Sequence, residues 1–479
     1  MSRDNIVIDV QGRTTQGLGI LQSDLTILDS KFSKSGALSQ KWRIRTRREP
    51  LMEVPGLLQD LSAALGDNYS ADISSDDGTP TSLPYTPSPP PQHYLAQALV
   101  ATFEVPHSGY KLTAFGSYMR QIPRYLGEST ALDAAVACLT DAHDCMMRRD
   151  AGCENQVSNP VLYLKALQRL QAALKDPLTG TSACTLAATT LLGIVETLGG
   201  LKKDSKYLSH AGGTMKIIEI RGPSSHIDGF DGQILRSQRG KIIIQSLWSG
   251  TSCFLESKDW RNVAFHENAD LTETDLYHDK VLKHLILIPR LLRDYRSLSH
   301  AESAALSLDI LYRLRSLRSS LRDLGLGLES RLHDPQVCTE VPSDVHDSLV
   351  PVCYSFADWP EVQIYSHFWA LTIVANTMLM DLTGSMEQEA LCCETAQKIC
   401  KLYECSRRAR PFGSHFMVLS LATAFRWVPT EEMKDWIVEA LNELADAKAT
   451  GMWWCTLAVE YFADMLMGKN EPMLVHTTG

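Results

Sequence analysis

Apolar residues recur every three or four positions through most of the chain after residue 94, which is the spacing of one buried helix face. In one segment this stripe consists of Val161, Leu164, Leu167, Leu170 and Leu174. An Asn-Pro pair at 159–160 opens the segment, with Asn as the N-cap and Pro at the first helical position. Asp176 precedes Pro177 and is therefore disfavoured in helical geometry. The pattern predicts a helix between these two signals.

The same reasoning predicts helices over the following ranges: 130–149, 182–198, 205–220, 230–249, 277–298, 301–324, 359–382, 386–409, 412–426, 430–447 and 451–467. No run of alternating strand segments with hairpin turns accompanies them, and the stretch around 325–357 is typical of a loop. We therefore predict an all-α domain over 94–467 with about 12–14 helices.

The two ends of the chain have a different texture. Residues 1–67 show no strong helix before Leu51 and predict a flexible tail with a basic cluster at 41–48. Residues 68–93 are rich in Ser, Thr and Pro, have almost nothing apolar to bury and predict a disordered linker. We expect 468–479 to be a disordered C-terminus.

Composition places this domain among soluble, intracellular proteins. Hydrophobic residues make up 44% and charged residues 21% of the chain, and no secretory signal stands at its start. Two long uncharged runs, 177–195 and 362–380, contain many Thr, Ser and other polar residues, which favours buried core helices over membrane spans. Twelve cysteines in 479 residues are too few for a disulfide scaffold.

Positive charge is concentrated in the tail. Residues 31–50 hold seven basic residues and one Glu, so the rest of a chain with net charge −10 carries −16. We favour a nuclear-import signal for the dense part, with a minor nucleic-acid arm and an ordinary solvated stretch as alternatives. The residues concerned are Lys41, Arg43, Arg45, Arg47 and Arg48.

Signatures of catalysis and of cofactor binding are missing from the sequence. It contains no nucleophile elbow, no P-loop and no H-E-x-x-H, and the paired Asp76 and Asp77 fall in the predicted linker. No C-x-x-C occurs; Cys393 and Cys400 are seven apart on a predicted helix and are interpreted as buried core thiols. We therefore predict no catalytic residue, no cofactor and no metal.

Three histidines lie in apolar surroundings. His210 precedes Ala-Gly-Gly, and His367 and His415 lie in aromatic-rich stretches. We interpret all three as core histidines with satisfied hydrogen bonds.

Several segments, taken in order, resemble the fungal-specific transcription factor domain, the all-α regulatory region of fungal zinc-binuclear-cluster activators. The resemblance spans roughly Tyr94 to Phe462. It is carried by four segments: His210-Ala211-Gly212-Gly213 through Met215 to Arg221-Gly222-Pro223; Gln233 to Leu247 with Cys253-Phe254-Leu255 and Trp260; Asn159-Pro160 to Asp176-Pro177; and Arg410-Pro411-Phe412-Gly413 through Trp427 to Trp436-Ile437.

The sequence departs from such activators because no cysteine precedes Cys138, so their six-cysteine zinc cluster is missing, either truly or by truncation of the gene model. What the resemblance implies is a fungal transcriptional regulator, or a regulator-like protein, of a metabolic or secondary-metabolite gene cluster. It would reside in the nucleus, or in nucleus and cytoplasm. Its partners would be other regulators or coactivators, or a second copy, with DNA bound only weakly or through a partner and no membrane contact. An all-α enzyme with an unrecognised site and a helical interaction scaffold are the alternatives.

Overall fold

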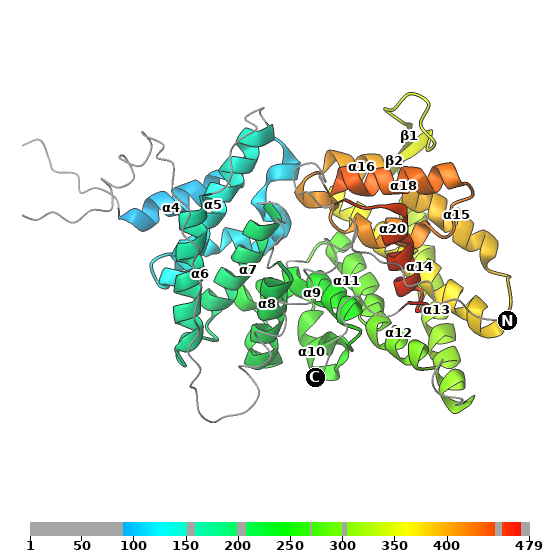
Figure 1. Cartoon of the computed structure of the whole chain (residues 1–479), viewed down its shortest axis with the longest axis horizontal. Helices are drawn as coiled ribbons and strands as arrows, with labels where there is room; N and C mark the ends of the chain where they lie inside the picture. The colour runs from blue at the N-terminus through cyan, green and yellow to red at the C-terminus, as the bar shows by residue number, and fades with distance from the viewer. Residues whose placement is uncertain are drawn as a thin grey trace, which may run out of the picture. The chain divides into compact units, whose positions relative to one another are not determined.

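A computed structural model describes residues 90–150, 159–198, 207–268, 271–298, 304–445 and 453–470. Its first half consists of helices and short 3-10 turns (Figure 1). The elements are α4 (Pro91–Ala101), η2 (Ser108–Tyr110), η3 (Leu112–Phe115), η4 (Ser117–Arg120), η5 (Ile122–Tyr125), α5 (Thr130–Asp150), α6 (Pro160–Lys175), α7 (Ala183–Leu198), α8 (Tyr207–Arg221), η6 (Pro223–His226) and α9 (Gly229–Ser249).

The second half adds further helices and one hairpin of two antiparallel strands. The elements are η7 (Phe254–Glu256), α10 (Lys258–Ala264), α11 (Glu273–Leu285), α12 (Ile288–Ser297), α13 (Ala304–Leu332), β1 (Cys338–Pro342), β2 (Val352–Phe356), α14 (Trp359–Thr383), α15 (Glu389–Cys400), α16 (Tyr403–Arg408), η8 (Phe412–Ser414), α17 (Met417–Ala424), α18 (Glu431–Leu444) and α20 (Thr456–Leu466).

The predicted all-α class is confirmed. Within the described residues, fourteen helices have eight residues or more, and α10 and α16 are shorter. The capping signals explain where individual helices begin. The side chain of Asn159 accepts a hydrogen bond from the Val161 backbone N–H at 2.9 Å, and α6 ends at Lys175, before the Asp176-Pro177 pair.

Two helices that are apolar on nearly all sides organise the core. In α7 nearly every residue is buried, and α5, α6 and α8 pack around it. Three of its threonine hydroxyls donate to carbonyls within the helix, as Thr189 does to the Thr185 carbonyl at 2.8 Å, and that of Thr185 donates to the Thr179 carbonyl before the helix. In the second half α14 takes the same role and contacts α11, α13, α15 and α17.

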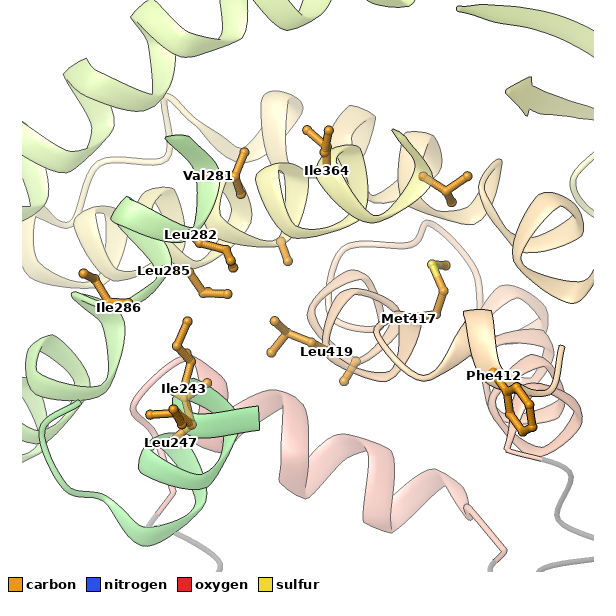
Figure 2. Packing of buried hydrophobic residues seen from close by; sticks show 14 of the residues in the cluster. Ile243, Leu247, Val281, Leu282, Leu285, Ile286, Ile364, Phe412, Met417 and Leu419 are labelled. Carbon is orange, nitrogen blue, oxygen red and sulfur yellow. The ribbon is translucent and has the colours of Figure 1, made fainter. Parts of the chain in front are cut away.

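Helix α9 joins these two groups of helices because it touches α7 and α8 on one side and α11 and α12 on the other. Figure 2 shows how this junction is filled: Ile243 and Leu247 of α9 lie opposite Leu282 and Leu285 of α11. All four side chains are at most 4% exposed. Burying large aliphatic side chains of this kind stabilises the fold by about 1.5–3 kcal/mol each.

The prediction fails where helices are interrupted. The range 277–298 is two helices, α11 and α12, because Pro289 cannot supply the backbone N–H that a continuous helix needs. The range 386–409 likewise divides into α15 and α16, and 412–426 into η8 and α17.

The predicted loop over 325–357 is also wrong at both ends. Helix α13 continues to Leu332, and the rest contains the β1–β2 hairpin, in which Cys338 pairs with Phe356 and Pro342 with Val352. The backbone N–H of Tyr354 in β2 also donates to the Lys401 carbonyl at 3.0 Å, so the hairpin is anchored beside α16.

The predicted domain limits differ from the structure by a few residues. Helix α4 begins at Pro91, inside the range 68–93 given to the linker, because proline fits the first helical position, where its missing N–H costs nothing. At the other end, within 468–479, Lys469 pairs with Asp381 at 3.5 Å and the Asn470 carbonyl accepts from Arg296 Nε at 2.8 Å. These contacts attach the first residues of that range to the helical domain.

Candidate functional site

A pocket of about 470 Å³ opens between the loop that joins β1 to β2, α16 and α18. Figure 1 shows these elements next to one another, and α16 contacts both β2 and α18. Six of the fourteen lining residues are acidic and none is Lys or Arg. We call this pocket the acidic groove; its carboxylates belong to Asp347, Glu404, Glu432, Asp435, Glu439 and Glu443.

Helix α18 supplies most of this charge. Glu432, Asp435, Trp436, Glu439 and Glu443 follow one another at intervals of one, three or four residues, so they share one helix face. The opposite face is buried through Met433, Ile437, Leu441 and Leu444. The Thr430 side chain caps the helix by accepting from the Met433 N–H at 3.2 Å. The amphipathic pattern of α18 therefore turns its acidic face toward the groove.

Aromatic and aliphatic side chains give the groove an apolar surface between its carboxylates. The rings of Tyr403 and Trp436 meet edge to face, with centroids 5.1 Å apart. Across the groove the hairpin loop contributes Val345 and Leu349, which are 48% and 49% exposed. The groove thus offers apolar contacts beside negative charge, a combination that suits a ligand with cationic and apolar parts.

Two of the carboxylates hold the walls in place. Glu404 is 2% exposed and accepts hydrogen bonds from the Ser343 hydroxyl and from the Asp344 N–H, the latter at 3.2 Å. Glu443 accepts from the Tyr403 hydroxyl and pairs with Arg410 at 3.3 Å. These contacts join the hairpin loop to α16 and α16 to α18, so the groove is built before any ligand enters it.

Of the other four carboxylates, Asp347 lies 2.8 Å from the Nδ1 of His346, and three are open to a ligand. Among the described residues, Glu432, Asp435 and Glu439 have no Lys or Arg partner. The backbone at the start of α18 and the Thr430 hydroxyl hold the pKa of Glu432 below its ordinary value, so this carboxylate stays ionised at neutral pH. The groove therefore presents uncompensated negative charge beside Trp436.

A second polar cluster lies in the interior between α9, α11 and α14. Asp279 is 2% exposed and pairs with Arg236 at 2.6 Å and with Arg239 at 2.8 Å. Next to this pair, the rings of His278 and His367 stack with centroids 6.2 Å apart. Burial lowers the pKa of His367 to about 4 and that of His278 well below its ordinary value, so both are neutral at pH 7. We assign this cluster a structural role because it ties α9, α11 and α14 together.

The residues singled out from the sequence fall in different places. Lys41, Arg43, Arg45, Arg47 and Arg48 lie outside the described residues, as does the side chain of His210. His367 is buried as expected, at 5% exposure, but its Nδ1 has no hydrogen-bond partner. The prediction for His415 is wrong: its side chain is exposed, because it follows the short turn η8 and precedes α17 rather than lying within a helix.

The cysteine predictions agree with the structure in part. Cys393 and Cys400 both lie on α15, and Cys400 is 1% exposed whereas Cys393 is half-buried. Burial raises the pKa of the Cys400 and Cys138 thiols to about 12, so neither is a thiolate at neutral pH. In the described part of the chain, no three His, Cys, Asp or Glu side chains gather as metal ligands would.

The sequence analysis did not predict the acidic groove, although the sequence contains the pattern that forms one of its two walls. A helix was predicted over 430–447, and its acidic residues at intervals of three and four would have marked a negative face around Trp436. The other wall could not be found in this way, since it depends on a hairpin whose strands are joined by a loop of nine residues, 343–351.

None of the described helices combines the length and apolar character that crossing a bilayer requires. Comparison with known proteins gives no matching family model and no matching solved structure. An uncharacterized protein of Emericella nidulans, AN5342, is 29% identical over 207 residues. The match covers 41% of this chain and 43% of that protein, so the chain is similar to less than half of the fungal relative.

Proposed function

We propose that this chain is a regulator of transcription that acts through a partner protein, which it binds in the acidic groove through a basic segment of that partner. The observation that carries the proposal is the preformed groove, in which Trp436 lies among three carboxylates that have no basic partner in the described part of the chain. The resemblance to fungal regulatory domains is the reason for proposing a role in transcription. The similarity to a protein of Emericella nidulans is consistent with a fungal origin.

The chemistry of the groove favours binding over catalysis. The carboxylates of Glu404 and Glu443 form the contacts that hold the walls of the groove. A carboxyl group that acts as a general acid needs a raised pKa, whereas the pKa of Glu432 is lowered. Cys353 and Cys400, which also line the groove, have thiol pKa values raised to about 12 by burial. A regulator without enzyme activity therefore fits these residues better than a hydrolase or transferase does.

Contact between a partner and this groove would depend strongly on charge. Attraction between opposite charges speeds the association of two proteins, and salt screens this attraction. A buried aromatic side chain supplies much of the affinity. We therefore expect a basic segment with an aromatic or aliphatic residue to bind, and to bind more weakly as the salt concentration rises. The partner would bring the DNA contacts, since the folded body of this chain is acidic.

Transcript profiling of cells that lack the gene tests the proposal. The deletion is complemented with the wild-type chain or with a triple variant, Glu432→Lys, Asp435→Lys and Glu439→Lys. We expect the wild-type chain to restore a defined set of transcripts and the triple variant to fail at equal protein level. A matched control reverses three exposed carboxylates on other helices, Asp144→Lys, Asp309→Lys and Glu394→Lys, and should restore the transcripts.

Two outcomes would overturn the proposal. If the deletion leaves the transcripts unchanged, the chain is not a regulator, and the enzyme or scaffold alternatives stand instead. If the triple variant restores the transcripts as well as the wild type does, the groove is not the site through which the chain acts.

A further inference from the structure

A pocket of about 280 Å³ opens between α11 and α13 and shares no lining residue with the acidic groove. We call it the α11–α13 pocket. One water takes up about 30 Å³ of liquid volume, so the pocket has room for a small organic molecule. Its lining residues are Tyr277, Lys280 and His284 of α11 and Asp323, Leu324 and Gly327 of α13.

Local helix geometry places both walls of this pocket. On α11, Tyr277, Lys280 and His284 follow one another at intervals of three and four residues, so they share one helix face. The adjoining face packs into the core through Leu285, which is 4% exposed (Figure 2). On α13, a Cβ atom on Gly327 would lie 3.1 Å from the Tyr277 hydroxyl oxygen. A glycine weakens the interior of a helix, and here it gives the Tyr277 side chain room to lie against α13.

Four polar side chains line the pocket, and none of them forms a hydrogen bond or an ion pair with a described residue. They belong to Tyr277, Lys280, His284 and Asp323. The Nζ atom of Lys280 lies 4.5 Å from the centroid of the Tyr277 ring, and Asp323 is exposed on the opposite wall. The pocket therefore presents one positive and one negative charge that do not neutralise each other.

The remaining lining groups add hydrogen-bonding capacity and an apolar surface. Burial lowers the pKa of His284 below its ordinary value, and the positive charge of Arg261 lowers it further, so the imidazole is neutral at pH 7. A neutral imidazole donates one hydrogen bond and accepts another, and the Tyr277 hydroxyl does the same. Leu324 and the ring of Tyr277 provide the apolar part of the wall.

We propose that the α11–α13 pocket binds a small zwitterion of the aliphatic amino acid class. The carboxylate of the ligand pairs with Lys280 and accepts a hydrogen bond from His284, its ammonium group pairs with Asp323, and its aliphatic side chain contacts Leu324. A simple anion is repelled by Asp323 and a simple cation by Lys280, whereas a zwitterion gains from both charges. The bound ligand thus joins α11 to α13.

The exposure of the two charges sets the strength of binding. Lys280 and Asp323 are both exposed, and ion pairs that water reaches contribute only modestly to affinity. We therefore expect a dissociation constant on the order of 0.1–1 mM. For the same reason, loss of one charge should weaken binding by about three- to tenfold, and not abolish it.

An NMR titration of the full chain with L-leucine tests the proposal. The probes for comparison are 4-methylpentanoate, which lacks the amino group, and isoamylamine, which lacks the carboxylate. We expect leucine to bind and each analogue to bind at least threefold more weakly. Lys280→Gln and Asp323→Asn should each weaken leucine binding at least threefold. The matched controls lie on the same two helices and remove charges that are paired elsewhere: Lys283→Gln, whose lysine pairs with Glu267, and Asp309→Asn, whose aspartate pairs with Arg313. Both should bind leucine as the wild type does.

Three results would overturn the proposal: no binding of leucine up to about 10 mM, an analogue that binds as tightly as leucine, or a loss of affinity in the control variants equal to that in Lys280→Gln and Asp323→Asn. Circular dichroism shows whether each variant is folded. If a pocket variant unfolds, the comparison of leucine with its two analogues on the wild-type chain decides the question. The acidic groove takes no part in this assay, so its outcome is independent of the proposed partner site.

Discussion

Removing the Asp279 carboxylate tests the interior packing between α9 and α11. Asp279 is the carboxylate that both Arg236 and Arg239 contact, at 2.6 and 2.8 Å. Arg239 is 3% exposed and cannot reach water if this partner is lost. Burial already lowers the pKa of Arg239 to about 10 although Asp279 acts in the opposite direction. Asp279→Ala would therefore leave a guanidinium group in the interior without a counter-charge.

The expected loss is about 3–5 kcal/mol of the free energy of unfolding, the range found when one partner of a buried ion pair is removed. Arg239 keeps its bond to the Ala264 carbonyl at 2.8 Å, and Arg236 can turn toward solvent, which favours the lower half of this range. Urea unfolding followed by circular dichroism measures the loss as a shift of the midpoint at constant slope.

Two further variants make this test specific. Asp309→Ala removes a carboxylate whose side chain is 57% exposed and 3.3 Å from Arg313, and should cost less than about 1 kcal/mol. The double variant Asp279→Leu with Arg239→Met replaces the buried pair by apolar side chains and should be more stable than Asp279→Ala alone. A loss for Asp279→Ala no larger than that for Asp309→Ala would refute the account of this cluster.

Three other predictions concern pH, metal content and the basic cluster. His367 has a pKa of about 4 in the folded chain and about 6.5 when unfolded, so between these values the unfolded state binds more protons and stability falls as pH falls. We expect the free energy of unfolding of the His367→Leu variant, measured with urea from pH 7 to 4, to fall less steeply with decreasing pH than that of the wild type. An equally steep fall would contradict the lowered pKa of His367. Elemental analysis of dialysed protein should find no stoichiometric zinc; one or two ions per chain would show that the cysteine pattern was misjudged. Replacing Arg43, Arg45, Arg47 and Arg48 by Ala should reduce nuclear accumulation seen by fluorescence microscopy and leave the circular dichroism spectrum intact, whereas unchanged localisation would remove the import hypothesis.

Local patterns were sufficient to predict most helices. Four helices, α5, α7, α9 and α14, agree to within one residue at each end with the predicted ranges 130–149, 182–198, 230–249 and 359–382. Helix caps and apolar periodicity depend only on residues close together in the sequence, so they can be recognised without the structure. The breaks at α11–α12 and α15–α16 were missed, since the apolar stripe continues across them although the backbone does not.

The candidate site was harder to predict, because it depends on pairs distant in the sequence. Glu404 meets the Asp344 N–H across 60 residues, and Tyr403 meets Glu443 across 40. The basic cluster at 41–48 was the clearest electrostatic feature of the sequence, and it lies outside the described residues.

Chromatin immunoprecipitation of the tagged full chain is the most direct test of partner-dependent regulation. The account predicts enrichment at defined promoter regions for the wild type, and loss of that enrichment for the Glu432→Lys, Asp435→Lys, Glu439→Lys variant at an unchanged nuclear level. Absence of any enriched region for the wild type, or equal enrichment for the variant, would contradict it.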